Sequence, residues 1–203
     1  MSRLATSFVL GYHGCDQTIA DRAVNGEIEL LHSDKDFDWL GPGAYFWESD
    51  PQRASEWASW QKTRGQVAVP AVVGAVIDLR NCFDLVAREN LELLKEAHKS
   101  FIIAQKKAGL PVPKNRGARG QSDSDRILRY LDCAVIRHFH SILNAQPSDD
   151  RRIEPFDTVR GMFAEGRRLY TGSGFRQKNH VQLAVLNDAC ILGLFHPRAE
   201  QVI

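Results

Sequence analysis

The chain has 203 residues, which suits a single domain with an insertion or two small domains. Hydrophobic residues make up 43% of it and charged residues 25%, an ordinary balance for a globular protein with a sizeable core. The formal net charge is +1, so no overall electric field singles out nucleic acid or a membrane surface as the partner.

The N-terminal segment predicts a strand, a helix and a second strand. Residues 8–14 are typical of a strand, and this strand ends in Tyr-His-Gly. Asp16 is suited to cap a helix that ends at Asn25 and Gly26. A short strand is expected at 28–31, followed by a polar loop.

A Gly-Pro-Gly turn at 41–43 organises the next stretch. The glycines allow a tight turn, which leads into a short aromatic strand from Tyr45 to Trp47. Asp50 followed by Pro51 predicts an N-cap and the first residue of a helix. Tyr45 is then at a strand edge beside a helix start, where a ring can stack on a flat heterocycle. The alternative is that these aromatic residues simply fill a core.

The middle of the chain predicts a buried strand and two helices. Residues 67–79 are valine-rich and typical of a central strand that is covered on both faces. A helix is expected from about 89 to 107, and a basic loop with prolines and glycines follows at 109–124. Asp123 or Ser124 is expected to cap the second helix. The segment from about 88 to 145 is therefore interpreted as a two-helix insertion in a β-rich frame.

The last third returns to strands. They are expected at 158–163 and 168–170, and a glycine-rich polar loop follows. Residues 180–186 alternate between apolar and other residues, so Gln182, His180 and Ala184 share one strand face. A last strand is expected at 190–195. The whole pattern predicts an α+β fold, with residues 1–203 forming a single domain.

Cysteine spacing and hydropathy indicate whether the chain binds a metal, crosses a membrane or forms disulfides. The cysteines lie far apart without a Cys-x-x-Cys pair, which argues against a zinc site and predicts free thiols: Cys15, Cys82, Cys133 and Cys190. No signal peptide is recognisable, and no apolar run approaches the length of a membrane span. The sequence therefore predicts a cytoplasmic protein with no metal and no membrane partner.

Three strand-borne groups stand beside glycine-containing turns or loops: His13, Tyr45 and Gln182. Tyr-His-Gly, then Gly-x-Tyr-Phe before an alanine-rich helix, then a late-strand glutamine resemble the diphtheria-toxin and poly(ADP-ribose) polymerase branch of the ADP-ribosyltransferases. That family has a histidine, a tyrosine and usually a glutamate at these places. The resemblance covers roughly residues 8–79 and 156–196, but not the helical insertion. It implies a split antiparallel β-sheet frame and is closest to bacterial members.

The resemblance also implies a co-substrate, NAD+, and a set of residues that bind it: His13, Gly14, Tyr45, Phe46, Tyr12 and Phe175. In this reading His13 binds the adenosine ribose, the backbone at Gly14 holds the carboxamide, and Tyr45 stacks on the nicotinamide ring. A second aromatic ring closes the other side of the pocket. Phe46, Phe175 and Tyr170 stay open as candidates for it.

Gln182 departs from the family pattern in an informative way. A glutamine keeps the hydrogen bond to the nicotinamide ribose, but it lacks the negative charge and cannot act as a general base. This favours transfer of a single ADP-ribose over polymer elongation. His180 shares its face and is the second catalytic candidate, because it can orient or deprotonate an acceptor group. Basic residues nearby are candidates for phosphate contacts: Arg160, Arg167, Arg168, Arg176 and Lys178.

The expected function is that of a mono-ADP-ribosyltransferase, a glycosyltransferase that cleaves NAD+ and transfers ADP-ribose to a protein or nucleic acid. The resemblance implies a bacterial toxin or anti-phage effector, and it leaves an antitoxin partner open. The glutamine also motivates an inactive module that binds NAD+, ADP-ribose or RNA. A related RNA 2′-phosphotransferase ranks low, because no arginine adjoins His13 or Tyr45. The acceptor, the oligomeric state and the role of the insertion stay open.

Overall fold

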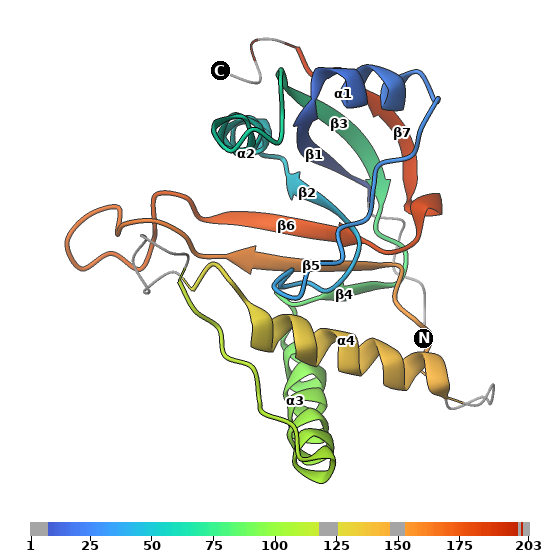
Figure 1. Cartoon of the computed structure of the whole chain (residues 1–203), viewed down its shortest axis with the longest axis vertical. Helices are drawn as coiled ribbons and strands as arrows, with labels where there is room; N and C mark the ends of the chain where they lie inside the picture. The colour runs from blue at the N-terminus through green and yellow to red at the C-terminus, as the bar shows by residue number, and fades with distance from the viewer. Residues whose placement is uncertain (1–7, 118–125, 147–152, 199, 201–203) are drawn as a thin grey trace.

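A computed structural model describes residues 8–117, 126–146, 153–198 and 200 of the chain. These residues form an α+β fold with a seven-stranded mixed sheet (Figure 1). Its elements, in chain order, are β1 (Phe8–Asp16), α1 (Gln17–Val24), β2 (Ala44–Glu48), α2 (Pro51–Thr63), β3 (Pro70–Asp78), β4 (Cys82–Asp84), α3 (Arg88–Ala108), α4 (Tyr130–Ala145), β5 (Thr158–Phe163), β6 (His180–Val185), the 3-10 turn η2 (Asp188–Cys190) and β7 (Ile191–Phe195).

The strand order across the sheet is β4-β5-β6-β2-β1-β3-β7. Every neighbouring pair is antiparallel except β4 and β5, which are parallel. The expectation of a wholly antiparallel frame is therefore corrected to a mixed sheet. The reason is the two-helix segment between β4 and β5, because a long crossover lets the chain return in the same direction. The expected α+β class and the helix pair within 88–145 are confirmed.

The sheet opens between β1 and β2. β1 pairs with β3 along its whole length, but with β2 at two positions alone, Gly11 opposite Glu48 and Tyr12 opposite Trp47. Figure 1 shows β1, β3 and β7 crossing the direction of β6, β5 and β4 at a steep angle. The edge of β1 from His13 onward is thus unpaired with β2, although β2 is its neighbour.

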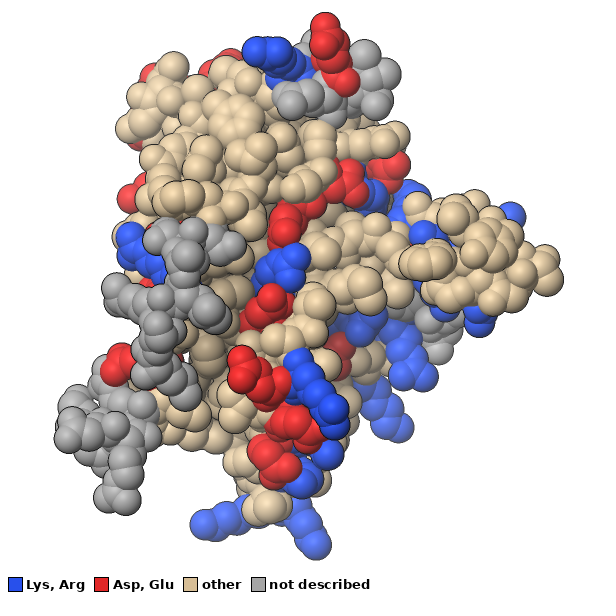
Figure 2. All heavy atoms as spheres, turned by 180° about the vertical axis from the view of Figure 1, so that it is seen from behind, with Lys and Arg blue, Asp and Glu red and all other residues tan. Residues whose placement is uncertain are grey.

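The two faces of the sheet carry different helices. α1 covers one face, where Phe46, Val73 and Leu183 pack with the helix residues Ala20 and Ala23. The other face is covered by α2 and by the α3–α4 pair. There one cluster joins α2 to β1–β3, and a second joins the helix pair to β4, β5 and β6. We call these the α1 face and the α2 face. α3 carries the ion pairs Glu92–Lys95 and Glu96–Lys99. Figure 2 shows acidic and basic side chains side by side on the lower part of the molecule.

Helix starts follow the local signals at α1 and α2 but not at α4. Asp16 and Asp50 cap α1 and α2 as predicted, and Pro51 is the first residue of α2. Asp123 and Ser124, expected to cap the second inserted helix, lie outside the described residues. α4 begins only at Tyr130, and the Oδ1 of the distant Asn115 accepts from two of its first backbone N–H groups.

Two expected strands are absent from the described residues. Residues 28–31 have no strand pairing, and the chain there makes its first bridge at Ser33 with Gly43. Residues 168–170 contribute a single bridge, Arg168 with Arg176, inside the loop between β5 and β6. Both segments are apolar enough to suggest strands, but no neighbouring strand edge reaches them.

Asp16 links α1 to the start of β3, and this link makes stability depend on pH. Its carboxylate accepts from Thr18, Ala68 and Val69 backbone N–H groups. These hydrogen bonds, that from Val69 first, lower the pKa of Asp16 from 3.8 to about 2. A pKa depressed by folding stabilises the protein above the ordinary Asp pKa, and this stabilisation is lost as the pH falls from about 4 to about 2.

We therefore expect Asp16→Asn to unfold at lower denaturant concentration than the wild type at pH 7. The difference between the two midpoints should shrink as the pH falls from about 4 towards 2. Denaturant titrations at a series of pH values measure this difference. Asp36→Asn, which removes one exposed carboxylate, controls for net charge. A difference that stays constant with pH would contradict the role given to Asp16.

Candidate functional site

The three motif residues lie on three neighbouring strands at the centre of the sheet. Gln182 is on β6, Tyr45 on β2 and His13 on β1, and these strands are adjacent in the order β6-β2-β1. Trp47 of β2 is opposite both Tyr12 and Gln182. Cross-strand partners share a face, so Gln182 lies on the α2 face. The three motifs, which are far apart in the sequence, therefore lie on adjacent strands.

His13 lies on the α1 face, opposite to the face of Gln182. Alternation along β1 separates it from Tyr12, and its ring makes an edge contact with Phe46 of the α1-face core. Its Nδ1 donates to the backbone carbonyl of Tyr45 at 2.8 Å. Burial lowers the pKa of His13, against the opposing effect of this hydrogen bond. His13 is thus a neutral imidazole that ties β1 to β2 where their regular pairing has stopped.

Gly14 is required by helix packing. A Cβ at this position would lie 2.1 Å from the carbonyl oxygen of Ala54 and 3.2 Å from the backbone nitrogen of Ala58. α2 therefore rests directly on the backbone of β1. A ligand was expected to approach the backbone of Gly14, whereas the atom that comes this close belongs to α2.

Tyr45 is half-buried and its hydroxyl is already engaged. The phenol donates to the carbonyl of Gly41 at 2.8 Å and accepts from the N–H of Leu40 at 3.0 Å. Its ring packs against the cluster that β4, β5 and β6 form with α3 and α4. Burial raises the pKa of the phenol above its ordinary value. The hydroxyl holds the Gly-Pro-Gly turn and the ring packs in this cluster, so stacking of the ring on nicotinamide stays a prediction.

Gln182 has an unexpected partner, Trp39. The indole N–H of Trp39 donates to Oε1 of Gln182 at 2.6 Å across 143 positions of sequence. Trp39 comes from the loop before β2 and packs edge-on against Phe163. A Cβ at Gly161 would lie 2.6 Å from its ring, so that glycine makes room for it. Trp39 was not predicted from the sequence, because nothing in the loop pattern places this ring against β5 and β6.

His180 belongs to a stack of aromatic rings on the α2 face. Its ring is parallel to Phe163 at 5.5 Å and 8°, and Trp47 is tilted against it at 6.4 Å. Nδ1 donates to the carbonyl of Lys178, and burial lowers the pKa to about 4. The stack continues from Trp47 to Trp57 of α2. Gln182 and His180 share one face, as predicted. The lowered pKa makes the His180 ring neutral at pH 7.

The structure removes two of the predicted NAD+-binding rings from the candidates. Phe46 is fully buried in the core on the α1 face, and Tyr12 is 4% exposed between α2 and Phe195. Both therefore act as core residues, which corrects the expectation that they contact a cofactor. Phe175 and Tyr170 are 64% and 61% exposed on the loop between β5 and β6. They stay open as rings that could close over a ligand.

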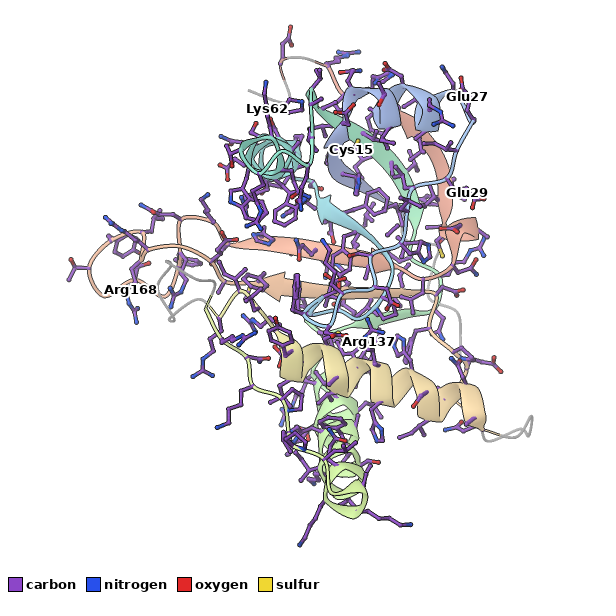
Figure 3. The ribbon with its side chains drawn as sticks, in the orientation of Figure 1. Cys15, Glu27, Glu29, Lys62, Arg137 and Arg168 are labelled. Carbon is purple, nitrogen blue, oxygen red and sulfur yellow. The ribbon has the colours of Figure 1, made fainter. Side chains whose placement is uncertain are left out.

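Two ion pairs connect the loop of residues 164–179 to α2. Arg53 pairs with Glu165 at 2.8 Å, and Lys178 pairs with Glu56 at 3.0 Å. Arg168 lies farther out on the loop, where Nη1 donates to the carbonyl of Ser173 (Figure 3).

Arg160 is not available for the phosphate contact expected from the sequence. It pairs with Glu48 at 2.6 Å and with Asp84 at 3.2 Å. Its partner across the strands is Leu183, so it lies on the α1 face, away from Gln182 and His180. Its guanidinium compensates two carboxylates on neighbouring strands.

Within the described residues no group of three His, Cys, Asp or Glu side chains is arranged to hold a metal ion. The four cysteines are free thiols, as predicted. Over the same ranges, no helix is both long and apolar enough to cross a membrane. No protein-family model, curated protein or solved structure matches the chain.

Proposed function

We propose that the chain is a mono-ADP-ribosyltransferase that uses NAD+ as its co-substrate. The observation that carries the proposal is the adjacency of β6, β2 and β1, with Gln182, Tyr45 and His13 beside the opening between β1 and β2. NAD+ would bind on the α2 face, with its nicotinamide ribose at Gln182. His13 lies on the α1 face and ties β1 to β2, so it would support this arrangement of strands.

The residues on the α2 face suit the chemistry of this transfer. Cleavage of the nicotinamide–ribose bond builds positive charge on the ribose, so correct positioning of the ribose hydroxyl matters most. Gln182 would accept from that hydroxyl. The Nδ1 of His180 donates a hydrogen bond, so Nε2 is the ring nitrogen that can accept a hydrogen bond or a proton. Its partner would be the group of the target molecule that receives ADP-ribose. Trp47 adds a buried indole N–H without a hydrogen-bond partner among the described residues, which a ligand oxygen would satisfy.

A second candidate is a module that binds NAD+ or ADP-ribose without cleaving it. The Trp39–Gln182 hydrogen bond favours it, because the indole N–H occupies one lone pair of the carboxamide oxygen and fixes its orientation. In the enzyme, the indole N–H and the ribose hydroxyl compete for this oxygen, so Trp39 weakens the contact with the ribose. In the binding module, Trp39 keeps its hydrogen bond to Gln182.

Trp39→Phe separates the two candidates. Phenylalanine keeps the ring that packs against Phe163 and removes the N–H group. If the protein is an enzyme, the release of nicotinamide should rise about five- to tenfold, the equivalent of one ordinary hydrogen bond. Trp60→Phe, on the exposed side of α2, is the matched control. No release of nicotinamide by either the wild type or Trp39→Phe would support the binding module.

The acceptor is found by mass spectrometry of proteins and nucleic acids from cells that express the chain. The proposal predicts an added ADP-ribose on one class of molecule, as a single unit. This modification should be absent from cells that express Gln182→Ala. Modification that is equal in both strains would contradict the role of Gln182.

A further inference from the structure

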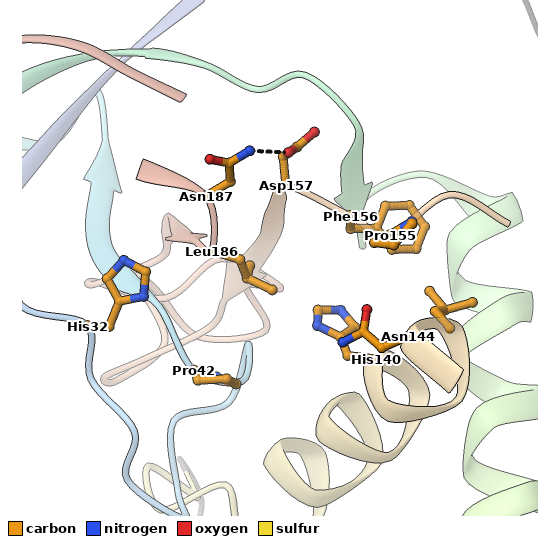
Figure 4. Close-up of a pocket in the computed structure, with 10 residues that line it drawn as sticks. His32, Pro42, His140, Asn144, Pro155, Phe156, Asp157, Leu186 and Asn187 are labelled. Atoms are coloured by element: carbon orange, nitrogen blue, oxygen red, sulfur yellow. Dashed lines mark hydrogen bonds between the residues drawn. The ribbon is translucent and has the colours of Figure 1, made fainter. Parts of the chain in front are cut away.

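A cleft of about 430 Å³ lies between the C-terminal half of α4, the end of β6 and the loop that follows α1 (Figure 4). None of the residues discussed for NAD+ lines it. Its volume is in the range of small-molecule sites. The residues that matter for its chemistry are His140, Asn144, Phe156, Leu186, Pro42 and Asp157.

His140 leaves a polar atom unsatisfied in this cleft. Its Nε2 is buried and has no hydrogen-bond partner among the described residues. Burial lowers its pKa to about 4, so the ring is uncharged at pH 7. Asn144 follows one helical turn later, and Figure 4 shows both side chains pointing into the same space. A neutral imidazole and a carboxamide together offer hydrogen-bond donors and acceptors without charge.

The other polar groups of the lining are already engaged. Asn187 donates through Nδ2 to Asp157 at 2.7 Å, and His32 pairs with Asp188 at 2.8 Å. The free hydrogen-bonding capacity therefore concentrates on His140 and Asn144. A ligand that hydrogen-bonds to His140 would supply a partner that none of the described residues provides.

The walls of the cleft favour a flat and uncharged ligand. Phe156 and Pro42 present rings, Leu186 presents an aliphatic surface, and none of the described residues that line the cleft is a lysine or arginine. Asp157 adds a carboxylate, which disfavours anions. Among the described residues, a phosphate or carboxylate ligand would therefore find no cation here. A planar heterocycle with donors and acceptors along one edge would fit both the walls and the polar pair.

We infer that this cleft is a binding site for an uncharged nitrogen heterocycle of the nucleobase type. The heterocycle lies against Phe156 and directs its polar edge to His140 and Asn144. This inference is independent of the proposed enzymatic activity, because the cleft shares no residue with the NAD+ site. It predicts that nucleosides bind better than the corresponding nucleotides.

The test is a calorimetric titration of the full-length protein and its variants with adenine, cytosine, uracil and adenosine, and NMR shifts of the His140 ring protons locate the bound base in the wild type. At least one of the bases should bind with a dissociation constant below about 5 mM. His140→Phe keeps the volume of the ring and should weaken binding about tenfold, the effect of one hydrogen bond. His138→Phe, on the same helix but bonded to Ser100, should leave binding unchanged.

Two further measurements decide the inference. AMP should bind more weakly than adenosine, and Asn144→Ala should weaken base binding without changing the unfolding midpoint. No binding of any probe by the folded protein would overturn the inference. It would also be overturned by binding that is unchanged in His140→Phe, or by AMP binding more tightly than adenosine.

Discussion

Gly14→Ala is expected to destabilise the protein by about 2–3 kcal/mol, although it adds a single methyl group. The new Cβ would lie 2.1 Å from the carbonyl oxygen of Ala54, and its three closest neighbours are backbone atoms of α2. A side chain could rotate away, but a helix backbone has to move as a unit. The substitution should therefore push α2 off β1 and loosen the cluster of Tyr12, Trp47 and Val72.

Gly193→Ala provides the matched control for this prediction. Gly193 is also in a strand, and a Cβ there would meet no atom within 4 Å. It should change stability by no more than about 0.5 kcal/mol. Denaturant unfolding of both variants measures the difference. Equal stability of Gly14→Ala and the wild type would show that α2 does not rest on β1 as described.

Gln182→Ala is expected to lower the turnover of NAD+ about 100-fold while changing NAD+ binding little. In the proposed reaction, the carboxamide holds the ribose hydroxyl most strongly in the transition state, where positive charge develops. Removing it should therefore lower kcat and leave the dissociation constant of NAD+ nearly unchanged. A loss of this size is typical of removing one hydrogen bond that stabilises a transition state. Kinetics and direct NAD+ binding, measured on the same preparations, separate the two effects.

Two variants control for this substitution. Gln182→Glu keeps an acceptor oxygen and adds negative charge, so its turnover should equal or exceed that of the wild type. Gln66→Ala removes an exposed glutamine after α2 and should have no effect. Equal losses of binding and turnover in Gln182→Ala would assign Gln182 to ground-state binding instead.

Helix caps and strand alternation could be predicted from the sequence, because they depend on residues close together in the chain. Asp16 and the Asp50-Pro51 pair predicted two helix starts, because a cap acts through neighbours two or three residues away. Alternation in 180–186 predicted correctly that Gln182 and His180 share a face. These features need no knowledge of the rest of the chain.

Elements that depend on distant partners were predicted less well. The start of α4 is fixed by Asn115, and residues 28–31 lack a strand edge to pair with. The parallel pairing of β4 with β5 joins segments on either side of the insertion. Periodicity along the sequence carries no information about such pairings, so the expectations failed there.

In the candidate site too, local features could be predicted from the sequence and contacts between distant residues could not. The strands of the three motif residues are neighbours, yet His13 and Gln182 lie on opposite faces. The Trp39 hydrogen bond to Gln182 was invisible in the sequence. Phe46 was expected to contact NAD+ as one of the rings that could close the pocket, but strand alternation turns it into the core. Which ring approaches a ligand is therefore decided by the pleat of the strand.

The most direct measurement is the release of free nicotinamide from NAD+ by the purified protein, with cell lysate as the source of acceptor. The account predicts steady release by the wild type, faster release by Trp39→Phe and a rate near background for Gln182→Ala. Release that is undetectable in both the wild type and Trp39→Phe, while all three proteins are folded, would contradict it.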